Sequence, residues 1–261
     1  QYLIGPDGSL TEINIPVAAG AVPVCIVVDP NGQYAYATNS FANSVSQYLI
    51  GADGSLTEFG IPAATGGNPL SIAVRARGKF AYVTNSSSDD ISQYTIEADG
   101  SLTAFPLTVT AGEFPISIAI DSSGIYAYVA NRDSANISQY TIGVGGRLTE
   151  IPPPVAAGTA PRAIAIDPGG QYVYVANSGD NNVSQYVIGD DGSLTEIAPP
   201  IAAGTDPIFV TVDPSGQYVY VTNSSDNNIS QYAIGDDGSL TEIDLPVATG
   251  AAPSSITIVS N

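Results

Sequence analysis

The 261-residue sequence contains no histidine, no methionine and no tryptophan, and it has a single cysteine. Without histidine, the side chain most often used for proton transfer near neutral pH is missing. Any acid–base chemistry would therefore depend on carboxylates. One cysteine excludes an intramolecular disulfide and every cysteine-based metal or haem motif. We expect Cys25 to be a small, half-buried structural residue.

Basic residues are scarce as well. Six Lys and Arg stand against 25 Asp and Glu, giving a formal net charge of −19. Nucleic acids and anionic membranes are bound by clusters of positive charge, so neither nucleic acid nor an anionic membrane surface is an expected partner. No apolar run approaches the roughly 18 residues that span a bilayer, so membrane insertion is not expected. We interpret the acidity as a source of solubility.

A 46-residue repeat fills the chain. Its clearest copy, residues 161–197, reads PRAIAIDPGGQYVYVANSGDNNVSQYVIGDDGSLTEI. Turn sequences separate four segments of strand character, over 163–166, 172–176, 183–188 and 193–197, so the unit is predicted to be a four-stranded antiparallel meander. The second segment is apolar or aromatic throughout and is expected to be buried on both faces. Five complete copies begin at Pro23, Pro69, Pro115, Pro161 and Pro207.

The period and the four strands predict an all-β fold, a β-propeller of antiparallel blades in one domain over residues 1–261. Residues 1–22 match the end of a repeat and 253–261 its beginning, so the chain is expected to be a mature product or a fragment. We expect a strand over 255–259 beside strands of the first 15 residues, closing a ring of about six blades. The alternative is a longer, seven-bladed ring of which this chain is a part.

Two further series recur at the repeat spacing. Asparagines close every second strand, which predicts a bond within the turn or between blades; they are Asn39, Asn85, Asn131, Asn177 and Asn223. The carboxylates of Asp190, Asp191, Asp236 and Asp237 lie in turn sequences, where Asp commonly binds backbone amides. The loop spacing of an EF-hand is absent. No metal site and no cofactor is predicted.

The second-strand segments YAYATN, FAYVTN, YAYVAN, YVYVAN and YVYVTN resemble the YVTN-type β-propeller repeat. The longer patterns PxxIAIDPxGxYVYVANS and VSQYxIGxDGSLTEI are similar to lactonase-family propellers, which include bacterial 6-phosphogluconolactonase-like proteins. The resemblance covers the whole chain. It implies a propeller fold and, as activity, hydrolysis of a sugar lactone. Related repeats in surface-layer and secreted proteins imply an extracellular, cell-surface or periplasmic location. No catalytic residue is identified by a local motif.

The repeats differ mainly in two loop series that a propeller would place on one face, and variable loops are where function has room. The candidate ligand-binding residues form a mixed-charge set: Glu113, Phe114, Arg132, Asp133, Arg162 and Asp206. With no histidine and uniform repeats, we favour a secreted or cell-surface scaffold that recognises a protein or glycan partner through these loops, within a larger assembly. The alternative is a lactonase-type hydrolase acting on a sugar lactone.

Overall fold

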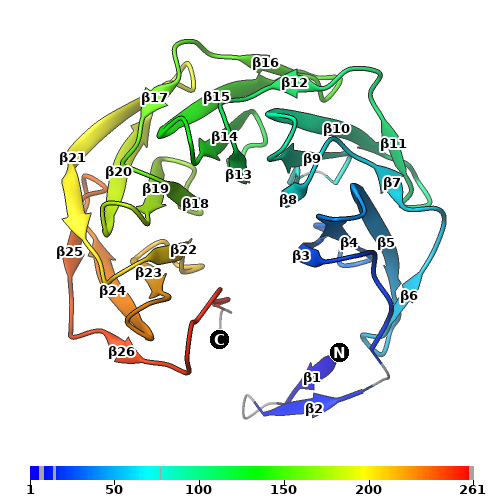
Figure 1. Cartoon of the computed structure of the whole chain (residues 1–261), viewed down its shortest axis with the longest axis horizontal. Helices are drawn as coiled ribbons and strands as arrows, with labels where there is room; N and C mark the ends of the chain where they lie inside the picture. Colours follow the sequence, from blue (N-terminus) through cyan, green and yellow to red (C-terminus); the bar gives the residue numbers. More distant parts are fainter. Residues whose placement is uncertain (6–8, 14–15, 77, 259–261) are drawn as a thin grey trace. The chain divides into compact units, whose positions relative to one another are not determined.

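The computed structural model describes residues 1–5, 9–13, 16–76 and 78–258. Strands and turns make up this described part of the chain, and it contains no helix. The chain divides into two compact units, Gln1–Val109 and Thr110–Asn261, each built from the same kind of antiparallel sheet (Figure 1).

The first unit begins with a half sheet of two antiparallel strands, β1 (Tyr2–Ile4) and β2 (Leu10–Glu12). Sheet 1 follows, with strands in chain order: β3 (Pro23–Val28), β4 (Tyr34–Asn39), β5 (Ser44–Ile50) and β6 (Leu56–Glu58), and β7 (Ala63–Ala64) pairing with β5. Sheet 2 repeats the order: β8 (Pro69–Val74), β9 (Phe80–Asn85), β10 (Asp90–Ile96) and β11 (Leu102–Ala104). The short β12 (Val109–Thr110) lies at the boundary of the units.

The second unit holds three sheets of the same design. Sheet 3 contains β13 (Pro115–Ile120), β14 (Tyr126–Asn131), β15 (Asn136–Ile142), β16 (Leu148–Glu150) and β17 (Val155–Ala156). Sheet 4 contains β18 (Pro161–Ile166), β19 (Tyr172–Asn177), β20 (Asn182–Ile188) and β21 (Leu194–Ala202). Sheet 5 contains β22 (Pro207–Val212), β23 (Tyr218–Asn223), β24 (Asn228–Ile234), β25 (Leu240–Glu242) and β26 (Val247–Ala248). All pairings are antiparallel, so the predicted meander is confirmed.

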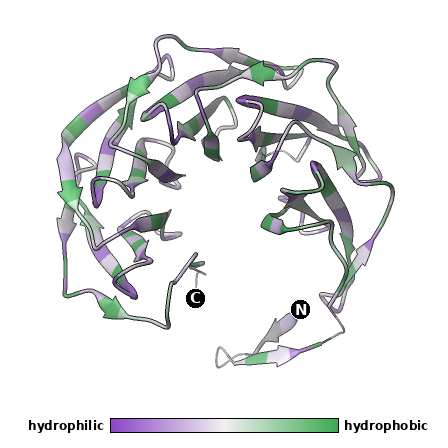
Figure 2. Ribbon diagram, viewed as in Figure 1, coloured by the Kyte–Doolittle hydropathy of each residue, from purple (hydrophilic) through white to green (hydrophobic). Residues whose placement is uncertain are grey.

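The hydrophobic core lies between neighbouring sheets. Alternate residues of a strand point to opposite faces, so β19 serves two interfaces at once. Its Val173 packs with Tyr128 of sheet 3, while its Tyr174 packs with Val210 of sheet 5. The second strand is therefore buried on both faces, as its composition predicts. Figure 2 shows bands of differing hydropathy along the strands.

Polar contacts fix the distance between neighbouring sheets. The Tyr174 hydroxyl donates to the carbonyl of Gly238 at 2.8 Å, and the Leu240 N–H donates to Gln185 Oε1 at 2.6 Å. Gly238 has a φ of +83° and lies against the ring of Tyr172, where an added Cβ would come within 2.2 Å of a ring carbon. The Asp-Gly turn is therefore required both for its backbone conformation and for close packing.

The chain ends differ from the expectation. Residues 255–258 form no strand, and Val259 lies outside the described residues. In every complete sheet the first strand pairs with the second strand of its own repeat. Sheet 4 also departs from the pattern, because its fourth strand extends to Ala202 instead of ending near Ile197. Closure between the two ends stays a prediction.

Candidate functional site

A buried polar cluster closes the second strand of each sheet. In sheet 4 the Asn177 Nδ2 group donates to Asn182 Oδ1 and to Ser184 Oγ, both at 2.8 Å. The same pair of bonds forms from Asn39, Asn85, Asn131 and Asn223. These bonds tie the second strand to the third across the hairpin. The predicted turn role of the asparagine series is therefore confirmed.

A second repeated contact holds the loop that precedes each first strand. The N–H of Thr159 donates to Asp180 Oδ2 and that of Thr205 donates to Asp226 Oδ2, both at 2.6 Å. In sheet 3 the acceptor is Ser134 Oγ, 2.7 Å from the Glu113 nitrogen. Sequence reasoning missed Ser134, although the series Ser88, Ser134, Asp180 and Asp226 keeps the 46-residue step. Ser and Asp can both occupy this position because either side chain offers an oxygen that accepts the bond from the loop.

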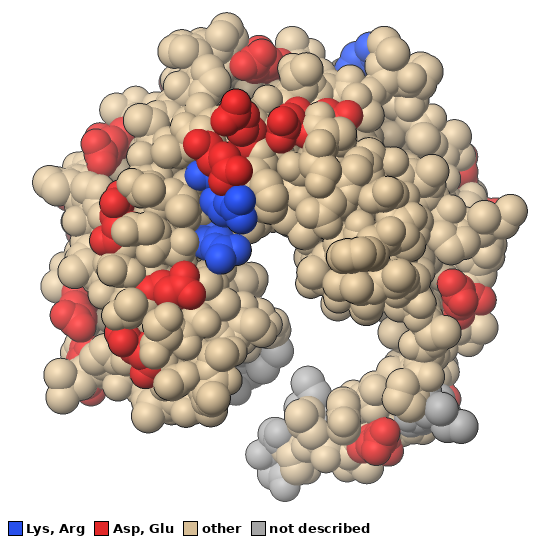
Figure 3. All heavy atoms as spheres, viewed as in Figure 1, with Lys and Arg blue, Asp and Glu red and all other residues tan. Residues whose placement is uncertain are grey.

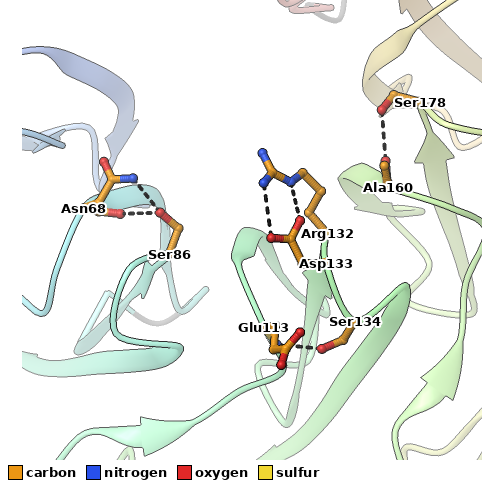
Figure 4. A network of polar contacts seen from close by, with 8 residues as sticks. All are labelled: Asn68, Ser86, Glu113, Arg132, Asp133, Ser134, Ala160 and Ser178. Atoms are coloured by element: carbon orange, nitrogen blue, oxygen red, sulfur yellow. Dashed lines mark hydrogen bonds and ion pairs between the residues drawn. The ribbon is translucent and has the colours of Figure 1, made fainter.

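The third repeat breaks the pattern at the end of its second strand. In the other four repeats the next residue is a serine, and in three of them its hydroxyl donates to the carbonyl of the preceding loop; the pairs are Ser40 with Val22, Ser86 with Asn68 and Ser178 with Ala160. Arg132 occupies this position in the third repeat, where Ser86 and Ser178 lie in two of the others (Figure 4). It keeps the backbone bond, from its nitrogen to the Phe114 carbonyl at 3.0 Å. The arginine side chain is thus free for another contact.

That contact is a stacked ion pair. Arg132 Nε donates to Asp133 Oδ1 at 2.7 Å and its Nη2 to Oδ2 at 3.2 Å, while the guanidinium carbon lies 3.6 Å from the centre of the Phe114 ring. The hydrogen bond from Arg132 holds the pKa of Asp133 below its ordinary value. Phe114 has a φ of +54°, a conformation shared by its counterparts in the other repeats, so its direction is set by the backbone. We call Phe114, Arg132 and Asp133 the stacked platform.

Of the other candidates, the structure places Glu113 beside the platform, through the bond from the Asp133 nitrogen to the Glu113 carbonyl at 3.2 Å. Among the described residues, the side chains of Arg162 and Asp206 form no hydrogen bond or ion pair with Glu113, Arg132 or Asp133. Asp206 lies in the loop before β22, where its nitrogen donates to Asn181 Oδ1 at 2.9 Å.

Arg162 lies on β18, at a position that is apolar in the other repeats: Val24, Leu70, Ile116 and Ile208. Its Nε is buried and has no hydrogen-bond partner among the described residues. In Figure 3, basic side chains gather over β14 and β18 with acidic side chains beside them. Two arginines and several carboxylates on adjacent sheets form a surface suited to an oxygen-rich polar ligand.

The described residues contain no group of three or more Cys, Asp or Glu placed to hold a metal ion. They also contain no helix long and apolar enough to cross a membrane.

Cys25 is free and half-buried, as expected, and burial raises the pKa of its thiol. The turn roles of Asp191 and Asp237 are confirmed, since each accepts bonds from the serine two residues later.

Comparison with known proteins identifies the family of this chain. Residues 14–160 and 145–258 match the model of the family described as lactonase, 7-bladed beta-propeller. A periplasmic gluconolactonase from Pseudomonas aeruginosa is 20% identical, with a TM-score of 0.87 over 99% of this chain and 79% of that one. A Bacteroides fragilis protein provisionally assigned as a 6-phosphogluconolactonase is 23% identical, with a TM-score of 0.85 over 97% and 78%.

A more distant neighbour is a catalytically inactive virginiamycin B lyase from Staphylococcus aureus with quinupristin, at 21% identity and a TM-score of 0.64 over 92% of this chain and 75% of that one. At such identities these likenesses show the fold alone. No curated protein matches the sequence. The predicted all-β propeller of four-stranded antiparallel blades is confirmed, and the family has seven blades where the repeat arithmetic favoured about six. This chain belongs to the lactonase family of seven-bladed β-propellers.

Proposed function

We propose that this protein is a hydrolase of a sugar lactone, and that the substrate binds over the stacked platform and Arg162. The observation that carries the proposal is the break in the repeat: within a family of lactonases, two departures from the repeat pattern, Arg132 and Arg162, are arginines on adjacent sheets. The family thus favours the hydrolase, which the sequence alone had placed second to a scaffold.

Hydrolysis of a lactone requires two kinds of side chain, a base and a group that stabilises negative charge. Water attacks the carbonyl carbon of the lactone while a carboxylate takes a proton from it. The bond between the carbonyl carbon and the ring oxygen then breaks, the carboxylic acid returns the proton to the ring oxygen, and the product is an open hydroxy acid. A guanidinium stabilises the negative charge that develops on the carbonyl oxygen. Arg162 has a buried nitrogen without a partner for this purpose. Glu113 and Asp206, whose carboxylates make no hydrogen bond among the described residues, are the candidate bases.

The charge of the site bears on the substrate. Asp133 occupies two of the donors of Arg132, so the platform is close to neutral and Arg162 is left as its main cation. A phosphorylated lactone would favour a larger cluster of Arg, Lys or His. We therefore infer that an uncharged sugar lactone is preferred. Its apolar ring face would lie against the platform, and its hydroxyl groups would bond to the carboxylates.

A lactone panel tests this. Hydrolysis of uncharged and phosphorylated sugar lactones is measured for the parent, Arg162→Ala and Arg132→Ala. We expect saturable turnover of an uncharged lactone, reduced about 100-fold or more in Arg162→Ala, as for loss of one oxyanion donor. Arg147→Ala is the matched control, because this exposed arginine lies on a turn between β15 and β16. Equal turnover in Arg162→Ala and Arg147→Ala would reject the site.

A recognition scaffold is the second candidate, and one observation favours it. The bidentate pair with Asp133 holds Arg132 in place, which suits a rigid binding surface. A protein or glycan ligand whose affinity falls in Arg132→Ala, with no turnover of any lactone, would establish this candidate instead. Under either function we propose an extracellular or periplasmic location, which the periplasmic Pseudomonas aeruginosa neighbour supports.

A further inference from the structure

An aspartate holds the turn between the first and second strands in four of the five complete repeats. In sheet 1, Asp29 Oδ1 accepts the N–H groups of Gln33 and Tyr34, both at 2.7 Å. The other oxygen of this carboxylate, Oδ2, accepts the N–H of Asn31 at 3.1 Å. The same three bonds form at Asp121, Asp167 and Asp213. The turn is therefore a loop of backbone N–H groups that binds a carboxylate of the chain itself.

The second repeat has no carboxylate at this point, because Arg75 stands in place of the aspartate. Its turn nevertheless keeps the backbone of the others. The Arg75 N–H donates to the Phe80 carbonyl at 2.9 Å, and the corresponding bond in sheet 1 is 2.8 Å. Gly78 has a φ of +65°, against +67° for Gly32 of sheet 1. The N–H groups at the end of the turn therefore keep the direction that they have in sheet 1.

Two of these N–H groups have lost their acceptor. Lys79 and Phe80 occupy the positions whose N–H groups bind Asp29 Oδ1 in sheet 1. Within the part of the chain that the structure describes, the N–H groups of Lys79 and Phe80 donate to no acceptor. Lys79 is exposed and Phe80 is half-buried, so an ion can reach both from the solvent. Arg77, the counterpart of Asn31, lies outside the described residues.

The turn is basic in a chain that is otherwise acidic. Arg75, Arg77 and Lys79 are three of its six basic residues. The guanidinium carbon of Arg75 lies 5.8 Å from the centre of the Phe80 ring, so this cation stands beside a residue whose N–H is unpaired. The Lys79 ammonium forms no ion pair with any described residue. Backbone N–H groups next to cationic side chains are the donors that bind oxyanions.

We propose that the turn between β8 and β9 binds a carboxylate group of a ligand, in the place that the Asp carboxylate takes in the other four complete repeats. An oxygen of this group accepts the N–H groups of Lys79 and Phe80, and the side chains of Arg75 and Lys79 balance its charge. A carboxylate is the expected oxyanion because the same backbone binds one elsewhere in the chain. Its source is a small organic acid or a carboxylated polysaccharide. The site uses none of the residues assigned to lactone hydrolysis, so its test is independent of that function.

Backbone amide NMR of the isotope-labelled full chain tests the site, with sodium acetate titrated against sodium chloride at constant ionic strength. We expect saturable shifts of the Lys79 and Phe80 amide resonances. In Arg75→Asp the turn regains its own carboxylate, so the affinity for acetate falls at least about tenfold, and the melting temperature in chloride rises. Arg147→Asp makes the same charge change on the exposed turn between β15 and β16, and this matched control keeps the affinity of the parent.

Polygalacturonate, which carries many carboxylates on one chain, distinguishes the two sources. Shifts at a carboxylate concentration at least about tenfold below that needed for acetate assign the site to a polysaccharide, and an equal or higher concentration assigns it to a small acid. The absence of shifts at Lys79 and Phe80 with both probes overturns the proposal. Equal affinity in the parent and Arg75→Asp also overturns it. So does an equal loss of affinity in Arg75→Asp and Arg147→Asp, because net charge would then explain the binding.

Discussion

Asn131 and Arg132 are neighbours in sequence, yet Asn131 belongs to the repeated core and Arg132 to a loop region that differs between repeats. Asn131 is fully buried, and its amide makes the two bonds that every repeat makes at this point. Arg132 replaces the serine of other repeats and contacts Phe114 and Asp133, and no other repeat has these contacts among the residues that the structure describes. A residue that recurs at every repeat is explained by the fold, whereas one that departs is free to serve a ligand.

The largest effect on stability should come from high pH, which acts on the tyrosines of the repeated core and not on the stacked platform. Burial raises the pKa of Tyr94 and Tyr140 from 10 to about 12, and burial also raises the pKa of Tyr36, Tyr82, Tyr128, Tyr174, Tyr186 and Tyr232. Burial favours the neutral phenol, so this stabilisation is complete below pH 10 and is lost as pH rises toward 12. For Tyr94 or Tyr140 it corresponds to roughly 3 kcal/mol.

We therefore expect cooperative unfolding in this pH window, followed by circular dichroism and by tyrosinate absorbance. Tyrosines that titrate near pH 10 while the fold persists would contradict it.

The stacked platform responds to low pH instead. The lowered pKa of Asp133 means that its stabilising pair with Arg132 is present above the ordinary Asp pKa and is lost as pH falls through the lowered value. Because Asp133 is exposed, the effect of acid on stability should be small.

Tyr174→Ala should be the most damaging single substitution in this comparison. The ring is fully buried between sheets 4 and 5, and its hydroxyl bonds to Gly238. Removing it leaves a cavity and an unpaired carbonyl, so the free energy of unfolding should fall by about 3–5 kcal/mol in denaturant titrations. Tyr218→Ala is the control, since Tyr218 is 37% exposed, and it should cost less than about 1 kcal/mol. Equal losses of unfolding free energy in Tyr174→Ala and Tyr218→Ala would show that the packing between sheets 4 and 5 is not the source of stability.

The core was predictable from sequence because each residue there repeats a simple cause. Val173 and Tyr174 follow each other in a strand of apolar and aromatic residues, and an Asp-Gly pair marks the turn before the fourth strand in four of the five complete repeats. The platform was predictable only as a set of variable loop residues. That Arg132 stacks on Phe114 depends on the positive φ of Phe114 and on a lost serine bond, neither of which a spacing reveals. The strand expected over 255–259 is not formed by the described residues 255–258, which pair with no other strand in the described part of the chain, and strand propensity is realised only beside a pairing partner.

Asn177→Ala tests the polar part of the core. Its amide joins Asn182 and Ser184 in a buried place, and removing it leaves both acceptors unpaired. The cost should be about 1–3 kcal/mol, less than that of Tyr174→Ala. Thermal and denaturant unfolding measure it. Asn182→Ala, which removes one of the two bonds at a half-buried site, should cost less, and the reverse order would mean that the cluster is held by Ser184 alone.

The smallest effect on stability, and the sharpest division between the regions, should come from Arg132→Ser. This change restores the residue of the other repeats, and a serine here can donate to the Phe114 carbonyl as Ser86 does to Asn68. It removes an exposed ion pair and a contact between arginine and an aromatic ring, each worth about 1 kcal/mol or less, and it adds one hydrogen bond. The free energy of unfolding should therefore change by less than about 1 kcal/mol, while lactone turnover or ligand affinity falls. A loss of stability as large as that of Asn177→Ala would show that the third repeat needs its arginine to fold, and the platform would then belong to the core.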